Sequence, residues 1–326
     1  MSKSSRVPIH MGPMRWGLTG LACLVVIGLG AGVMLGSGQA TLGSGQGLVV
    51  AARHPESLPE GADATQLGDT VLLMSDYFRE GQPSREALAL SALDGATLWH
   101  QTLVAPPLRA IEGGGHYWVA TLPQAQVAHL VALDPATGSV RMDVALGATL
   151  PALATLDGRS WLLQDSHVAA FDANTGAIGP TIWQLSTPSS GSIYRNLAAF
   201  QAGGQVQLIG SIGPDVFRLT ETNGVWVQDW LFHASKTVLE LLTVEWPSGR
   251  ATLAMAHSAV YAVNDAGQTI WRIDNTDINV NAHPVRCGPS DMRVAFRNPL
   301  SGVYLVGPAG LLKEWDLPGG NFHIGP

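Results

Sequence analysis

The chain has 326 residues, and its 46% of apolar side chains suffices for a large core. Its 38 glycines and 20 prolines indicate many turns and favour a β-rich protein. The formal net charge is −7, and the first 16 residues contain three basic and no acidic side chains. The rest of the chain therefore has 15 basic and 25 acidic side chains. So acidic a domain would repel the phosphate backbone, which excludes nucleic acid as a partner.

Residues 17–36 form an uncharged apolar stretch of twenty residues, the length that a helix needs to cross a bilayer. Basic residues precede it, so the positive-inside rule predicts a cytoplasmic tail over 1–16 and a body outside the cytoplasm. The sequence thus predicts a single-pass protein of a bacterial inner membrane, with its C-terminal domain periplasmic or extracellular. Two alternatives stay open: a signal peptide cleaved after Ala40, and a lipoprotein attached through Cys23.

Three glycines of this stretch, Gly28, Gly32 and Gly36, are spaced four apart and share one face of the predicted helix. Small residues at this spacing let two transmembrane helices approach closely, which predicts packing against integral membrane subunits. Chance is the alternative, because the stretch holds six glycines. The Gly/Ser-rich residues 37–47 predict a flexible linker, and residues 48–326 the folded domain.

From residue 88 onward one pattern recurs six times: an apolar strand, a polar residue that opens a turn, a closing glycine, and a strand with an aromatic residue. Asp or Asn can accept bonds from backbone amides ahead of it, and glycine adopts the left-handed conformation of short hairpin loops. The aromatic side chain can wedge against a neighbouring unit. The opening residues are Asp94, Asp134, Asp172, Thr220, Asn264 and Gly307; the closing glycines include Gly138, Gly176 and Gly267; the aromatic residues include Trp99, Trp271 and Trp315.

The opening residues recur at intervals of 38 to 48 residues. A period near 40–45 residues with four short strands per unit is typical of a β-propeller. We therefore expect an all-β, six-bladed propeller, with seven blades as the alternative. Residues 65–77 supply the inner strand of the first blade, and residues 47–52 complete the first or the last blade.

Two of the copies, VALDPATGSV around Asp134 and AAFDANTGAI around Asp172, resemble the quinoprotein-type (PQQ-like) propeller repeat. The resemblance spans residues 60–317 or so and implies the fold rather than an activity. The family contains alcohol and sugar dehydrogenases with a quinone cofactor and calcium. It also contains non-enzymatic envelope propellers, such as the lipoprotein subunit of the outer-membrane β-barrel assembly machinery.

The dehydrogenases of this family are much longer, eight-bladed propellers, often with two adjacent cysteines. The present chain has only Cys23 and Cys287, far apart, and no insertion that would build a calcium site. The resemblance therefore implies the non-enzymatic group, with no catalytic residue and no cofactor. The ten histidines do not pair at metal-ligand spacing, which predicts no metal site, and Gly113–Gly115 is expected to be a loop rather than a phosphate cradle.

The leading hypothesis is a non-catalytic scaffold or accessory subunit of a membrane complex, which binds proteins at its propeller faces. The longest irregular stretches are expected there: Arg79–Glu86, Ser186–Arg195 and Ile273–Pro289. One alternative is an enzyme or small-ligand binder of the quinoprotein type, using the mouth of the central channel. Another is a secreted ligand-binding propeller, which requires cleavage of the N-terminal segment.

Overall fold

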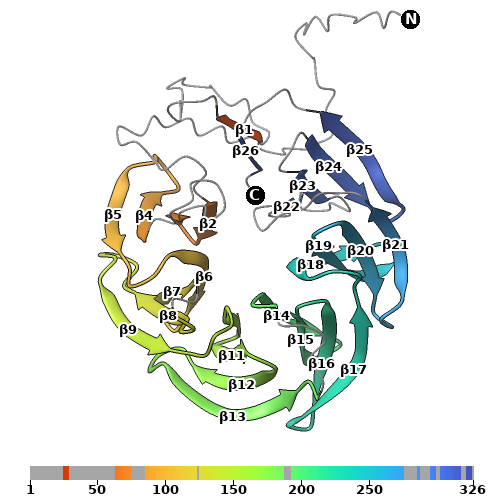
Figure 1. Ribbon diagram of the computed structural model, residues 1–326, viewed down its shortest axis with the longest axis horizontal. Coiled ribbons are helices and arrows are strands. Elements are labelled where there is room, and N and C mark those ends of the chain that lie inside the picture. The colour runs from red at the N-terminus through yellow and green to blue at the C-terminus, as the bar shows by residue number, and fades with distance from the viewer. Residues whose placement is uncertain are drawn as a thin grey trace, which may run out of the picture.

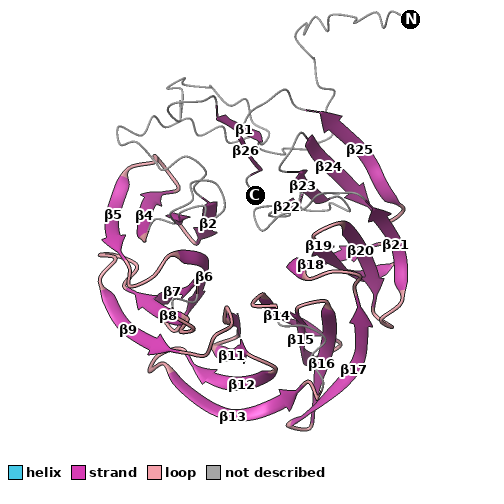
Figure 2. Cartoon of the chain, viewed as in Figure 1, coloured by secondary structure: helices cyan, strands magenta, loops and turns pink. Residues whose placement is uncertain are grey.

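The computed structural model describes residues 25–28, 63–74, 85–122, 125–186, 192–274, 285–286, 294–298, 302–316 and 321–324. Their regular structure consists of strands, which form six four-stranded sheets and one two-stranded sheet (Figure 2). The predicted all-β, propeller-like fold is confirmed.

Each four-stranded sheet is a blade in which consecutive strands pair antiparallel. Blades 1 to 3 are β2 (Asp63–Leu67), β3 (Thr70–Met74), β4 (Glu86–Ser91) and β5 (Thr97–Thr102); β6 (Pro107–Gly113), β7 (His116–Thr121), β8 (His129–Leu133) and β9 (Val140–Ala145); and β10 (Ala152–Leu156), β11 (Arg159–Gln164), β12 (His167–Asp172) and β13 (Ala177–Gln184).

Blades 4 to 6 repeat this arrangement. They are β14 (Arg195–Ala202), β15 (Gln205–Ile212), β16 (Asp215–Thr222) and β17 (Val225–His233); β18 (Val238–Trp246), β19 (Gly249–Ala256), β20 (Ala259–Asn264) and β21 (Thr269–Asp274); and β22 (Val285–Arg286), β23 (Val294–Asn298), β24 (Gly302–Gly307) and β25 (Gly310–Asp316).

The blades stand around a common axis, with the first strand of each blade innermost and the fourth outermost (Figure 1). The described core is divided into five apolar clusters, and each cluster joins two neighbouring blades. The middle strands are covered on both faces, which explains why their sequences are almost wholly apolar rather than alternating. Trp118 of β7, for example, is fully buried between blades 2 and 3.

All six predicted hairpins connect the third strand of a blade to its fourth. The fourth hairpin differs from the sequence prediction at its turn. Thr220 lies inside β16, and the chain turns at Asn223 and Gly224, both with positive φ (53° and 78°). Two consecutive residues with positive φ are what a two-residue type I′ hairpin requires, so this blade uses a tight turn in place of the longer Asp-opened one.

The N-terminal region differs from the predicted helix where it is described. Within residues 17–36 the structure describes only β1 (Val25–Gly28), a strand that pairs antiparallel with β26 (Asn321–Ile324). In the view of Figure 1 this pair lies between blades 1 and 6. The rest of the predicted helix and the predicted linker 37–47 lie outside the described residues. The described part of the chain contains no helix long and apolar enough to span a bilayer.

Candidate functional site

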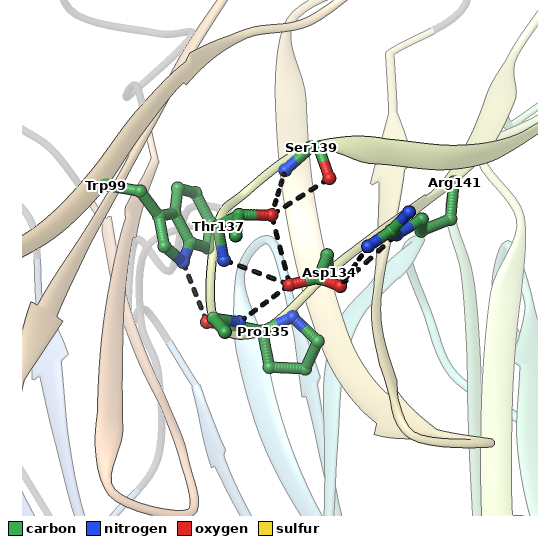
Figure 3. A network of polar contacts seen from close by, with 7 residues as sticks. Trp99, Asp134, Pro135, Thr137, Ser139 and Arg141 are labelled. Carbon is green, nitrogen blue, oxygen red and sulfur yellow. Dashed lines mark hydrogen bonds and ion pairs between the residues drawn. The ribbon is translucent and has the colours of Figure 1, made fainter.

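The Asp residues predicted to open the hairpins bond the backbone of their own turns. Asp134 Oδ1 accepts hydrogen bonds from the backbone N–H groups of Ala136 and Thr137, both at 3.0 Å, and from the Thr137 hydroxyl at 3.1 Å (Figure 3). Asp134 Oδ2 accepts two bonds from the Arg141 guanidinium, the shorter at 2.7 Å. Asp94 and Asp172 likewise accept bonds from backbone amides two residues ahead.

These contacts favour the ionised carboxylate. Hydrogen bonding by Arg141, followed by that of the Thr137 hydroxyl and of the backbone, lowers the pKa of Asp134 to about 2. The pKa values of Asp94 and Asp172 are lowered as well, first by the hydroxyls of Ser91 and Thr175 respectively. The aspartates of these three hairpins therefore serve local structure.

We expect the stabilisation by Asp134 to depend on pH. Because the pKa is lower in the folded than in the unfolded chain, this stabilisation is present above pH 4 and is lost as the pH falls through about 2. Wild type should thus be more stable than Asp134→Asn at pH 6, and the difference should shrink towards pH 2. Denaturant unfolding of both proteins across this range measures it; a difference independent of pH would contradict the assignment.

The predicted aromatic residues contact the hairpin of the next blade. Trp99 of blade 1 donates its indole N–H to the Pro135 carbonyl of blade 2 at 2.8 Å (Figure 3). Trp271 of blade 5 bonds the Gly307 carbonyl of blade 6 at 3.1 Å. Blade 2 has Met142 where the other copies have tryptophan, and its Trp118 bonds the Ala173 carbonyl of blade 3 instead, at 3.2 Å.

The closing glycines make room for these contacts. A Cβ on Gly138 would lie 2.4 Å from the Trp99 ring, and one on Gly267 would lie 2.8 Å from Trp230 of blade 4. Gly176 is packed by Val144 and Met142 of blade 2. The Gly113–Gly115 segment has the same purpose, because a Cβ on Gly114 would meet the backbone of Ala173 at 2.5 Å. The predicted loop is confirmed at Gly114 and Gly115, which connect β6 to β7, whereas Gly113 is the last residue of β6.

The remaining predicted site residues are less fully described. Trp315 lies in β25, but its side chain is outside the described part of the structure. Gly28 is the last residue of β1. Gly32 and Gly36 lie outside the described residues, so the predicted helix contact stays a prediction.

A second candidate site is a cavity of about 250 Å³ on the propeller axis. The inner strands of blades 1 to 5 line it. Most of its wall is aliphatic, and the polar part consists of Thr65, Arg109, Asn196 and Glu240. A cavity that combines apolar side chains with a few convergent polar groups is the usual form of a small-molecule site.

Arg109 crosses the axis from blade 2 to blades 4 and 5. Its Nη1 donates to the backbone carbonyl of Arg195 and to the Asn196 side chain, both at 2.6 Å. Its Nη2 donates to the Leu239 carbonyl and pairs with Glu240 Oε1 at 2.9 Å. The side chains of Arg109 and Glu240 are only 20% and 16% exposed. The guanidinium thus connects three blades through four acceptors.

The acceptors of Arg109 are themselves held in place. Asn196 is buried and donates to the Ser211 hydroxyl at 2.8 Å. The Arg195 side chain turns the other way, to the carbonyls of Asp165, Ser192 and Tyr194. Burial lowers the pKa of Arg195 to about 10, against an opposing effect of the Asp165 charge. The sequence analysis missed this network and contains no local signal of it, because β6 and β18 each contain a second charged residue, Glu112 and Glu245, and Asn196 of β14 is uncharged.

The connections of each blade separate into two faces. In a four-stranded meander, the turns after the first and third strands lie at one end, and the connections after the second and fourth strands at the other. All three long irregular stretches follow a second or a fourth strand: they join β3 to β4, β13 to β14 and β21 to β22. We call their side the loop face and the opposite side, with the hairpins of Figure 3, the turn face.

The described residues include no group of three or more His, Cys, Asp or Glu side chains placed to hold a metal ion. The polar networks that are described consist of turn bonds, ion pairs between strands or blades, and the contacts of Arg109. Such an arrangement is suited to holding the blades together and to presenting surfaces.

Comparison with known proteins identifies the repeat. Residues 84–230 match the model of the PQQ-like family described as "Outer membrane protein assembly factor BamB". The resemblance to the PQQ-like repeat is thereby confirmed for residues 84–230. No curated protein matches the sequence.

Solved structures share the fold. The structure of BamB from Moraxella catarrhalis has 18% identity and a TM-score of 0.49, over 80% of this chain and 74% of that chain. Apo AztD from Citrobacter koseri has 12% identity and a TM-score of 0.50, over 80% and 88%. A functionally unknown protein from Desulfotomaculum acetoxidans has 10% identity and a TM-score of 0.58, over 81% and 88%. At such identities the last two structures, with TM-scores of 0.50 and 0.58, show similarity of the fold alone.

Proposed function

We propose that this protein is a non-catalytic scaffold or accessory subunit of a membrane complex, displayed on the periplasmic or external face. The observation that carries the proposal is the match of residues 84–230 to the family of an outer-membrane assembly factor. That name describes the assembly of proteins rather than the conversion of a substrate, and we extend this kind of role to the present chain.

The architecture supports the proposal. We infer a six-bladed ring from the six four-stranded sheets. The buried apolar side chains of this ring pack between neighbouring blades. Binding surfaces are then left at the two faces and at the outer strands. The loop face is the first place to expect a protein partner, because loops on a rigid scaffold tolerate the sequence variation that recognition needs.

Membrane attachment is part of the proposal and rests on the sequence of residues 17–36. This segment would place the N-terminal tail in the cytoplasm and the propeller outside it. The glycine stripe at Gly28, Gly32 and Gly36 would contact a helix of an integral subunit, in a form of the chain in which residues 25–28 are helical instead of paired with β26. Cleavage after Ala40 is the competing outcome, and N-terminal sequencing of the mature protein distinguishes the two.

Affinity purification of the tagged full chain from native membranes in mild detergent tests the proposal. We expect integral membrane proteins to co-purify in a fixed ratio and to survive a wash at high salt. Membranes without the tagged chain, passed over the same resin, are the control. Recovery of the chain alone, as a monomer, would contradict the scaffold role.

The axial cavity favours a second candidate, the binding of a small molecule. At about 250 Å³ it is close to the lower limit of ordinary ligand sites, and Arg109 and Glu240 would provide its polar contacts. A chromophore that stays with the purified protein, or dye-linked alcohol oxidation stimulated by calcium, would support this candidate and contradict the scaffold role. Mass spectrometry under native conditions detects a retained ligand directly.

A further inference from the structure

The outer strand of each blade is the edge of its sheet, and an edge strand can pair with a strand of another protein. Soluble proteins prevent such pairing with charged residues, proline or short edges. Four of the six outer strands follow this rule: β9 contains Arg141 and Asp143, β13 contains Pro180, and β21 and β25 each contain a basic and an acidic residue. The strand β5 is only six residues long.

The outer strand of blade 4 differs from the others. β17 has nine residues, which makes it the longest of the six outer strands, and it contains neither proline nor a basic residue apart from its final His233. Its carboxylate, Asp229, bonds back to Arg218 Nε at 2.7 Å and to the Thr220 hydroxyl at 2.5 Å, both on the neighbouring β16. His233 likewise contacts Asp215 of β16, at 2.8 Å.

The side chains of β17 lie on two faces of blade 4, and a register shift at Asp229 reverses their alternation. Trp226, Trp230 and Phe232 contact Trp161, Arg218 and Tyr261 respectively, so the strand is fixed against its own blade and its neighbours. Three large apolar residues of the strand are substantially exposed: Val225 (62%) and Val227 (50%) on the face of Trp230, and Leu231 (46%) on the face of Trp226. No other described outer strand exposes three such residues. A strand that is ordered in advance loses little conformational entropy on binding.

We propose that β17 binds an extended segment of a partner protein, which adds to blade 4 as a fifth strand. Main-chain hydrogen bonds provide the affinity in this mode of recognition, and side chains at alternate positions provide the specificity. The segment carries apolar residues on both of its faces, to pack beside Val225 and Val227 on one face of the sheet and beside Leu231 on the other. It is neutral or basic opposite Asp229. This inference rests on the proposed function, because it names where the scaffold holds a partner.

Charge favours a partner segment over a second copy of this chain. Two β17 strands paired antiparallel about their middle residue would place two Asp229–Arg218 ion pairs opposite each other and gain no charge complementarity. The net charge of −7 also opposes self-association. A neutral or basic segment is not repelled by the negative charge of this chain.

Photocross-linking from within β17 tests the inference in the full-length protein. Benzoylphenylalanine is placed singly at Val225, Val227 and Leu231, and at Ile270 of β21 as a matched exposed position on another outer strand. We expect the three β17 positions to cross-link to residues of one segment in one partner protein, and Ile270 to give no such adduct. Adducts with a second copy of this chain, or adducts scattered over unrelated proteins, would overturn the inference.

Charged substitutions provide the quantitative test. Val227→Lys should lower the recovery of that partner at least tenfold, because a lysine on the edge blocks strand addition, and Leu231→Lys should do the same if the first variant folds poorly. Ile270→Lys is the control and should leave recovery unchanged. If wild type and Val227→Lys recover the partner equally, the β17 inference is wrong and the scaffold role stands. If wild type recovers no partner at all, the proposed function itself fails.

Discussion

Replacing Arg109 with Met should lower the free energy of unfolding by about 3 kcal/mol. This value is near the lower end of the cost of breaking a buried ion pair, because the side chains of Arg109 and Glu240 are both partly exposed. The substitution leaves Glu240 without its cation, and removes the bonds to Asn196 and to the carbonyls of Arg195 and Leu239. Desolvated acceptors that lose their donor carry most of the cost. Denaturant unfolding of the purified full-length protein in detergent measures the change.

Arg141→Met is the matched control. Arg141 also pairs with a carboxylate, that of Asp134, but its side chain is 53% exposed, so its removal should cost less than about 1 kcal/mol. The double variant Arg109→Met/Glu240→Leu should recover part of the loss, because it removes the unpaired charge as well. Equal and small effects for Arg109→Met and Arg141→Met would contradict the role of Arg109 in connecting the blades.

Gly138→Ala should destabilise the protein by about 3 kcal/mol through two additive effects. At φ +68° an L-residue is strained by roughly 1–2 kcal/mol. The added Cβ would also lie 2.4 Å from the Trp99 ring and would displace it from the hairpin of blade 2, at a cost of about 1–3 kcal/mol. The expected result is therefore a loss larger than backbone strain alone produces.

Gly158→Ala separates the two effects. Gly158 has a similar φ of +75°, but a Cβ there would have no heavy atom within 4 Å. It should show only the strain, about 1–2 kcal/mol. Thermal and denaturant unfolding of the two variants side by side provide the comparison. If Gly158→Ala proves as costly as Gly138→Ala, the contact between Trp99 and the next hairpin does not contribute to stability.

The fold followed from the sequence where a local pattern is repeated. The Asp-to-Gly turns, such as Asp134 to Gly138, are fixed by side chains a few residues apart, so their chemistry and period can be read directly. The fourth copy shows the limit of this reasoning. Thr220 occupies the expected position, but Asn223 and Gly224 form a tighter turn that begins three residues later, because these two residues adopt the positive φ angles that a two-residue hairpin requires.

The axial network could not be predicted in the same way. Arg109, Asn196 and Glu240 belong to three blades, and they meet only because the ring brings inner strands together across the axis. No local period records such a contact. The exposed edge at β17 could not be predicted for a related reason. An edge is recognised only when the outermost strand of the blade is known, and the order of strands in the sheet is not contained in the composition of a single strand.

The size of the particle that the full-length chain forms in its native membrane tests the central claim most directly. Membranes are solubilised in mild detergent, and the tagged chain is purified and measured by size-exclusion chromatography with light scattering, corrected for bound detergent. The account predicts a protein mass well above the 34.3 kDa of one chain, with integral membrane proteins in constant proportion across the peak. A protein mass equal to that of a single chain would contradict it.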